Sequence, residues 1–244
     1  KLGAKLTIVD PDIVNPAQTV RWPIGLQATD EFKVNVLKNY LITNYPHVQI
    51  SPIIYRVGNR VGEVELEKGD PKITKSQKSQ FWQAVDSADI IVDATAEIGV
   101  QRFMSYVAHE HKKTYLFVSA SSGVLGGYLG YFSPKDNTSG CWVCLQHSLY
   151  AKKDGDQEYI PVPPTDEKDG VLPAGCAHET FTGTGHDLQV MSNQATRLIV
   201  QHFGNKSIES CFLRMSFEGP LSTPKWEKFA IPKITECQEC SRMT

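Results

Sequence analysis

Four absences mark this sequence. No run of eighteen apolar residues is present, and no basic segment followed by an apolar one opens the chain. An excess of charge of one sign is also lacking, because the 25 Lys and Arg residues nearly balance the 27 Asp and Glu residues, which leaves a net charge of −2. The balance gives no electrostatic case for nucleic acid or an anionic membrane as partner. An initiator Met is missing too, and residues 1–6 resemble a helix end entering a strand, so we expect an upstream segment.

Cysteine is present in a pattern that favours metal binding. Two single residues, Cys176 and Cys211, accompany two C-x-x-C pairs, formed by Cys141, Cys144, Cys237 and Cys240. Four thiolates in two knuckles suit a structural zinc ion, which would join the chain's tail to its middle across 92 intervening residues. A redox motif is the main alternative. Such a pattern is typical of a reducing compartment, so we expect a cytoplasmic protein.

The first half of the chain alternates strand and helix patterns. Apolar runs that end in an acid predict buried strands at residues 6–10 and 88–93, and further strands are expected at 47–57 and 114–119. Helical spacing is found at 30–45, with Asp30 as the cap and Pro46 as the stop, and again at 100–108. We expect an α/β fold with a mostly parallel sheet, in which Asp10 and Asp93 lie at carboxyl ends of strands. Residues 58–79 are charged and predict a surface excursion.

The second half has another texture. Glycine and apolar residues at 123–132 predict antiparallel pairing, and strands are expected at 207–217 and 225–231. Residues 152–173 are charged and proline-rich, which predicts a long exposed loop. A helix is expected from residue 187 to 203, with Gly204 as its stop.

Several motifs occur in an order that resembles a known family. Residues 9–15 (VDPDIVN), Arg21, Lys33, residues 44–48 (NYPHV) and residues 89–95 (DIIVDAT) are followed by the two cysteine pairs and the segment around Cys176. This ordered set resembles the ubiquitin-activating-enzyme-like (ThiF/MoeB) adenylyltransferases. Residues 176–183 are most similar to the activating domain of bacterial fusions of conjugating and activating enzymes, found in anti-phage (CBASS-like) operons.

The resemblance implies a Rossmann-like adenylation domain over residues 1–244, with residues 152–186 as the crossover loop that carries the catalytic cysteine. The family's first strand and glycine-rich G-x-G-x-x-G loop would precede Leu2 and are missing from this chain, so the chain alone should bind ATP poorly. The family usually has an acid for Mg²⁺ shortly after the position of Asp93. Here Ala96 and Glu97 follow Thr95, so either Asp93 or Glu97 would take that role, or the metal is held differently.

The resemblance also implies roles for single residues. Asp10 or Asp12 would accept hydrogen bonds from the ribose hydroxyls of ATP, while Asn15, Arg21 and Lys33 would contact its phosphates. Taken singly, these residues have plainer interpretations, since the aspartates suit a turn and lone cations are usually surface groups.

The activity that the resemblance implies has two steps. ATP would adenylate the C-terminal carboxylate of a ubiquitin-like protein, and Cys176 would take the acyl group as a thioester for transfer to a conjugating cysteine. The resemblance also implies a conjugating-enzyme domain as partner and a homodimer, and the sequence does not tell whether that domain is fused upstream. From its position alone Cys176 is equally well a buried, inert thiol. Two alternatives stay open: activation of a sulphur-carrier protein, and a catalytically silent half that binds a ubiquitin-like partner or dimerises.

Overall fold

The computed structural model divides into two compact units, Lys1–Ala88 and Asp89–Thr244. It describes residues 4–16, 19, 22, 24–58, 74–121, 126–150, 160–161, 185–204, 208–217 and 223–241. The predicted crossover loop at 152–186 falls almost entirely outside these residues. No helix in the described ranges is long and apolar enough to cross a lipid bilayer.

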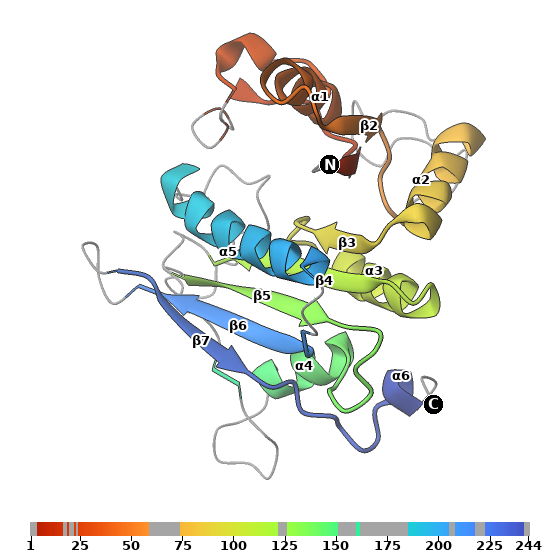
Figure 1. The fold of residues 1–244 in the computed structure, drawn as a ribbon, viewed down its shortest axis with the longest axis vertical. Helices are drawn as coiled ribbons and strands as arrows, with labels where there is room; N and C mark the ends of the chain where they lie inside the picture. The colour runs from red at the N-terminus through yellow and green to blue at the C-terminus, as the bar shows by residue number, and fades with distance from the viewer. Residues whose placement is uncertain are drawn as a thin grey trace. The chain divides into compact units, whose positions relative to one another are not determined.

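The first unit is built on a parallel pair of strands (Figure 1). β1 (Lys5–Val9) pairs with β2 (Gln49–Ile53), with Lys5 opposite Gln49 and Val9 opposite Ile53. α1 (Lys33–Asn44) is the crossover between them, as the predicted strand–helix–strand order requires, and α2 (Lys75–Ser87) follows. A short 3₁₀ helix, η2 (Leu26–Ala28), precedes α1.

The start of α1 differs from the prediction. Phe32, not Asp30, is the cap residue, and no side chain caps the helix. Asp30 has a φ of 70°, which belongs to a turn, and its amide donates to the carbonyl of Val14 at 3.1 Å. The carboxyl end of the helix is as expected, since Tyr45 is the C-cap residue and Pro46 follows it.

The predicted surface excursion at residues 58–79 was wrong at its carboxyl end, because α2 begins at Lys75, inside that segment. Thr74 and Gln77 form a reciprocal capping box that satisfies free amides of the first turn. Only Phe81 and Val85 of this helix are buried, so its apolar stripe is narrow.

The second unit contains a five-stranded mixed sheet in the order β3-β4-β5-β6-β7. β3 (Ile90–Asp93) and β4 (Thr114–Ala120) are parallel and joined by α3 (Ile98–Glu110). The sheet continues with β5 (Gly126–Phe132), β6 (Cys211–Ser216) and β7 (Lys225–Phe229). Each of these strands is antiparallel to the strand before it in the sheet, β5 to β4, β6 to β5 and β7 to β6. The expected combination of parallel and antiparallel strands is confirmed.

Helices cover the sheet of the second unit on both faces. α5 (Gly185–Phe203) packs on one face through Met191, Ala195 and Leu198, which contact alternate residues of β4, β5 and β6. α3 lies against the other face, where the Tyr115 hydroxyl donates toward the Gln101 carbonyl. α4 (Trp142–Tyr150) lies on the side of the sheet opposite α5, and the short α6 (Gln238–Ser241) follows β7 (Figure 1).

Candidate functional site

The turn after β1 carries two aspartates in a fixed arrangement. The Asp10 amide donates to the carbonyl of Ile53 at 3.3 Å, which ties the turn to the end of β2. The amide of Asp12 donates to the Asp10 carboxylate at 2.7 Å. Because β1 and β2 run parallel, both carboxyl ends meet at this edge, where ligands of α/β sheets bind.

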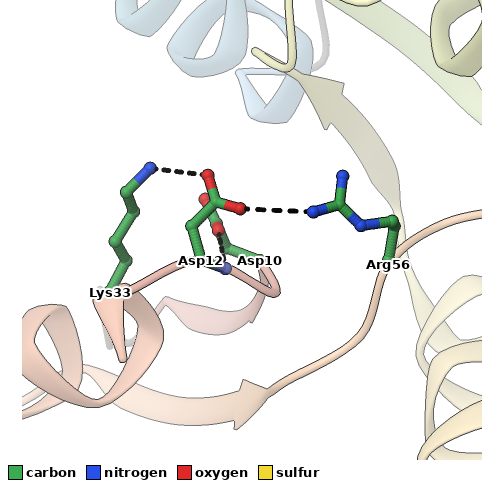
Figure 2. A network of polar contacts seen from close by, with 4 residues as sticks. All are labelled: Asp10, Asp12, Lys33 and Arg56. Carbon is green, nitrogen blue, oxygen red and sulfur yellow. Dashed lines mark hydrogen bonds and ion pairs between the residues drawn. The ribbon is translucent and has the colours of Figure 1, made fainter. Parts of the chain in front are cut away.

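Two cations converge on Asp12 (Figure 2). Lys33 Nζ lies 2.8 Å from Asp12 Oδ2, and Arg56 Nη2 lies 3.7 Å from Asp12 Oδ1. The Lys33 amide also donates to the Asp12 carbonyl at 2.9 Å, so α1 begins directly against the turn. The Lys33 side chain is only 13% exposed, whereas Asp12 is 40% exposed. A cation that is so well shielded acts more strongly on a nearby anion than one in bulk water.

Arg56 is the residue of this cluster that sequence reasoning missed. It stands three residues after the end of β2, the strand that pairs with β1. The one signal in the sequence was its position after a predicted strand. Because β1 and β2 are parallel, a residue just after β2 lies at the same edge of the sheet as Asp10, which follows β1. A lone arginine in no motif gave no other indication.

The two aspartates differ in their electrostatic surroundings. Burial raises the pKa of Asp10 above its ordinary value, although Lys33 and the hydrogen bond from Asp12 act against the rise. Asp12, in contrast, is paired with two cations. Asp10 is therefore the carboxylate better suited to accept hydroxyl donors, and Asp12 is suited to orient Lys33 and Arg56.

Asn15 lies on the same segment as Asp12. A bridge between Ile13 and Phe32 and a hydrogen bond from the Val14 amide to the Glu31 carbonyl hold this segment against the start of α1. Asn15 itself is exposed, so its side chain is accessible to a ligand. Arg21, the other predicted phosphate contact, lies outside the described residues.

Asp93 ends β3 in the second unit and is buried, with 3% exposure. It accepts hydrogen bonds from the Thr95 amide at 3.0 Å, the Thr95 hydroxyl at 2.7 Å and the Tyr115 hydroxyl at 2.9 Å. Burial and the Asp93 charge raise the pKa of Tyr115 far above its ordinary value, so this phenol stays a donor. Asp93 thus organises the turn in which Ala96 adopts a left-handed φ of 56°.

The four cysteines of the two C-x-x-C pairs come together in the second unit. Their sulfur atoms all lie within 4.8 Å of one another, and all four residues are buried. Cys141 Sγ lies 3.9 Å from Cys144 Sγ and 3.6 Å from Cys237 Sγ, and Cys144 Sγ lies 3.4 Å from Cys240 Sγ. A tetrahedral site with Zn–S bonds of about 2.3 Å separates its sulfurs by about 3.8 Å. The cluster therefore has the size of a four-thiolate zinc site.

The surroundings of the cluster fit a metal cation as well. The hydrogen bond to Cys144 and burial raise the pKa of Cys141 far above the ordinary range, because a second thiolate beside the first is poorly stabilised. The Ile234 amide donates to Cys144 Sγ at 3.5 Å, a common way to support a ligating sulfur. A divalent cation would offset the repulsion among four thiolates.

The two single cysteines differ. Cys211, interpreted from the sequence as core, is 2% exposed on β6 and packs in the cluster beneath α5. Cys176, the predicted nucleophile, lies outside the described residues.

Comparison with known protein families gives a match to the ThiF family over residues 3–238. The chain belongs to the ThiF family. Two curated relatives from Sinorhizobium fredii (strain NBRC 101917 / NGR234) are uncharacterized proteins. The y4oA protein is 28% identical over 239 residues, covering 96% of this chain and 38% of the relative. The y4qC protein is 30% identical over 197 residues, covering 80% of this chain and 32% of the relative. The chain thus spans about a third of the length of these relatives.

Solved structures share the fold of this ThiF-family chain. E. coli MccB, solved with ATP, has a TM-score of 0.63 at 12% identity, covering 97% of this chain and 59% of MccB. The PaaA structure has a TM-score of 0.57 at 11% identity, covering 93% of this chain and 56% of PaaA. At such low identity the likeness establishes the fold alone.

Proposed function

We propose that this chain carries the adenylating centre of an enzyme that joins a substrate carboxylate to the α-phosphate of ATP. The arrangement of Asp12 with Lys33 and Arg56, next to Asp10 at the carboxyl edge of β1 and β2, is the observation that carries the proposal. Membership of the ThiF family and the fold shared with MccB, which has been solved with ATP, support it.

The chemistry explains why such residues are needed. A carboxylate oxygen attacks the α-phosphorus, the new C–O–P bond forms, and the bond to the β-phosphate breaks to release pyrophosphate. Both reactants are anions, so cations must lower their repulsion and stabilise the charge that moves to the leaving group. In the proposal Asp10 accepts the ribose hydroxyls, while Lys33, Arg56, Asn15 and Arg21 contact phosphates.

Mg²⁺ belongs to the same proposal, as a cation that would neutralise phosphate charge. Of the two acids expected to hold it, the Asp93 carboxylate already accepts three hydrogen bonds from Thr95 and Tyr115. Glu97 is exposed and stands at the start of α3. This difference favours Glu97 as the magnesium ligand over Asp93.

The proposed substrate is the C-terminal carboxylate of a ubiquitin-like protein. In the second step the Cys176 thiolate attacks the acyl-adenylate carbonyl, a C–S bond forms, the C–O bond breaks and AMP leaves. Transfer to a conjugating-enzyme cysteine, a homodimer and a role in an anti-phage operon remain predictions of the family resemblance. A sulphur-carrier protein as substrate and a catalytically silent binding half remain the alternatives.

We propose further that Cys141, Cys144, Cys237 and Cys240 hold a structural zinc ion. The four buried sulfurs use all positions of a tetrahedral ion, so the metal would stabilise the fold rather than bind substrate. Support comes from the sulfur spacing and from the exclusion of water around the cluster.

Pyrophosphate exchange into ATP tests the adenylation step. The full-length protein is assayed with purified ubiquitin-like proteins, with sulphur-carrier proteins, and with the same proteins carrying an amidated C-terminus. We expect exchange that requires one class of partner and its free carboxylate. If protein that binds ATP shows no exchange with partners of either class, the result would favour the silent half and reject the enzyme.

The second step is tested with the Cys176→Ala variant. We expect unchanged pyrophosphate exchange but loss of the reducible protein–partner adduct on a non-reducing gel, because only the thioester needs the thiol. The Cys211→Ala variant is the matched control, since that cysteine is buried in the core. Adduct formation at the original level in Cys176→Ala would remove this residue from the mechanism.

A further inference from the structure

The loop between β5 and Cys141 is organised by one carboxylate, that of Asp136. Its Oδ1 atom accepts the Thr138 amide at 3.0 Å, the Thr138 hydroxyl at 2.7 Å and the Ser139 amide at 3.2 Å. Its Oδ2 atom accepts the Ser139 hydroxyl at 2.7 Å and the Ser210 amide at 2.8 Å. Five donors around one side chain hold the loop in a single conformation.

The same carboxylate links the loop to a distant part of the chain. Ser210 directly precedes β6, and its hydroxyl in turn accepts the Ser133 amide at 3.0 Å. Burial acts to raise the pKa of Asp136, but the hydrogen bonds from Ser139, Thr138 and Ser210 outweigh it and hold the pKa below the usual range. The carboxylate is therefore ionised at any physiological pH and keeps all its donors.

The far end of the loop contacts the segment that leads to the second cysteine pair. The Gly140 amide donates to the Ile231 carbonyl at 2.8 Å, and Lys233 Nζ donates to the Asn137 carbonyl at 3.4 Å. A Cβ atom on Gly140 would lie 2.3 Å from the Pro232 carbonyl oxygen and 2.6 Å from the Cys144 Cβ. One residue beyond Lys233, the Ile234 amide donates to Cys144 Sγ. The loop is thus packed against Cys144 and against the segment that leads to the second cysteine pair.

We infer that Asp136 is a positioning residue for the cysteine cluster, which sets the loop so that Cys141 and Cys144 face Cys237 and Cys240 before a metal binds. The inference rests on the zinc site proposed above and goes beyond it, because Asp136 is not a ligand. A loop that is already ordered loses less conformational entropy when the metal binds, so the site holds its ion more tightly.

Zinc transfer from the purified full-length protein to a chromophoric chelator tests the inference. In Asp136→Asn the amide group is about the same size but brings its own donors to face the amides and hydroxyls of Thr138 and Ser139. We expect zinc release up to about 10-fold faster than in the unaltered protein, below the 10–100-fold loss of affinity that follows loss of a direct partner of a metal ligand, because Asp136 acts through the loop. Ser139→Ala, which removes one donor of five, should accelerate release less and serves if Asp136→Asn does not fold.

Two controls separate positioning from general destabilisation. Asp89→Asn changes an exposed carboxylate before β3 and should release zinc at the original rate. Met191→Ala weakens the core beneath α5, so it should lower the melting temperature without a comparable change in zinc release. Release at the original rate in both Asp136→Asn and Ser139→Ala would overturn the inference, as would equal acceleration in Met191→Ala. Unaltered protein that contains no zinc would reject the metal site itself.

Discussion

The acidic turn of the first unit and the cysteine cluster of the second unit handle polar groups in opposite ways. Around Asp12, the charged side chains are partly exposed, and Asp10 is a half-buried carboxylate whose pKa is raised. Around Cys144, which is completely buried, the sulfurs face one another and the neighbouring loop satisfies its polar groups internally. This contrast is the one we expect between the two proposed sites: a ligand-binding site keeps its charged groups within reach of solvent, whereas a structural metal site is closed around its ligands. The difference predicts which substitutions change activity and which change stability.

The largest effect is expected from Cys144→Ser. It removes a ligand from a completely buried site, and structural zinc sites contribute on the order of 10 kcal/mol of folding free energy. We expect zinc to be lost, measured by metal analysis, and the second unit to be unfolded at room temperature, measured by circular dichroism. Cys211→Ser is the matched control: it changes an equally buried cysteine outside the cluster, so zinc content should be unchanged. A folded, zinc-free Cys144→Ser protein would break the comparison.

Lys33→Ala should act on activity and leave stability nearly unchanged. Removing one donor aimed at a developing charge typically lowers kcat by about 10²–10³-fold. Pyrophosphate exchange measures the loss, and urea denaturation should give a change in unfolding free energy within about 1 kcal/mol, since the pair with Asp12 is partly exposed. Lys75→Ala, at the exposed start of α2, is the control. A large loss of stability with full exchange activity would show that Lys33 stabilises the fold and does not act in adenylation.

Gly140→Ala tests how tightly the closed site is packed. The new methyl group would collide with the Pro232 carbonyl and with Cys144, so we expect about 1–3 kcal/mol of destabilisation in urea. Gly99→Ala in α3 is a matched control because no atom lies within 4 Å of the added Cβ, and alanine favours a helix. That variant should be as stable as the original or slightly more stable. Equal stability of the two variants would show that the loop yields easily.

The smallest effect is a stability gain in Asp10→Asn. A carboxyl whose pKa is raised by folding destabilises the protein once the pH exceeds that folded-state pKa, and it does so less at lower pH. Asparagine does not titrate, so Asp10→Asn should be more stable at pH 7, by under about 1 kcal/mol, and the gain should vanish as the pH falls below the ordinary Asp value. Urea denaturation at several pH values measures this, and ATP titration should show weaker binding. A variant that is less stable at pH 7 would contradict the assigned environment.

The strands before Asp10 and Asp93 were predictable from the sequence, but their predicted burial was wrong, because β1 is mostly exposed and β3 is only partly buried. The apolar runs before Asp10 and Asp93 mark strands that end at those residues or just before them. The helix at 75–87 was missed because only Phe81 and Val85 are buried, which leaves too few apolar positions to reveal a period, although its Thr74 and Gln77 capping box was readable. The helix at 142–150 was missed because apolar and aromatic residues, Val143 and Tyr150, also occur on its less buried face, so the sequence shows no clear amphipathic period.

The candidate site was predictable as a set of residues but not as an arrangement. The cysteine spacing alone indicates the metal cluster, and the order of Asp10, Asp12 and Lys33 indicates the acidic turn. Nothing in the sequence could decide which aspartate pairs with Lys33, or bring Arg56 to it across a strand pair. Asp136 was invisible too, because its contact with Ser210 joins residues 74 positions apart.

The path of the chain through the cysteine cluster has a consequence for biosynthesis. Cys141 and Cys144 leave the ribosome long before Cys237 and Cys240, since β6 and β7 lie between the pairs. A metal can then be captured by all four sulfurs only after nearly the whole second unit has emerged. Until that moment the early pair is an exposed dithiol, open to oxidation or to a competing metal, and Asp136 cannot yet find Ser210 to set the loop. Metal loading at the proposed zinc site would therefore be a late event that reports completion of the chain through Cys240.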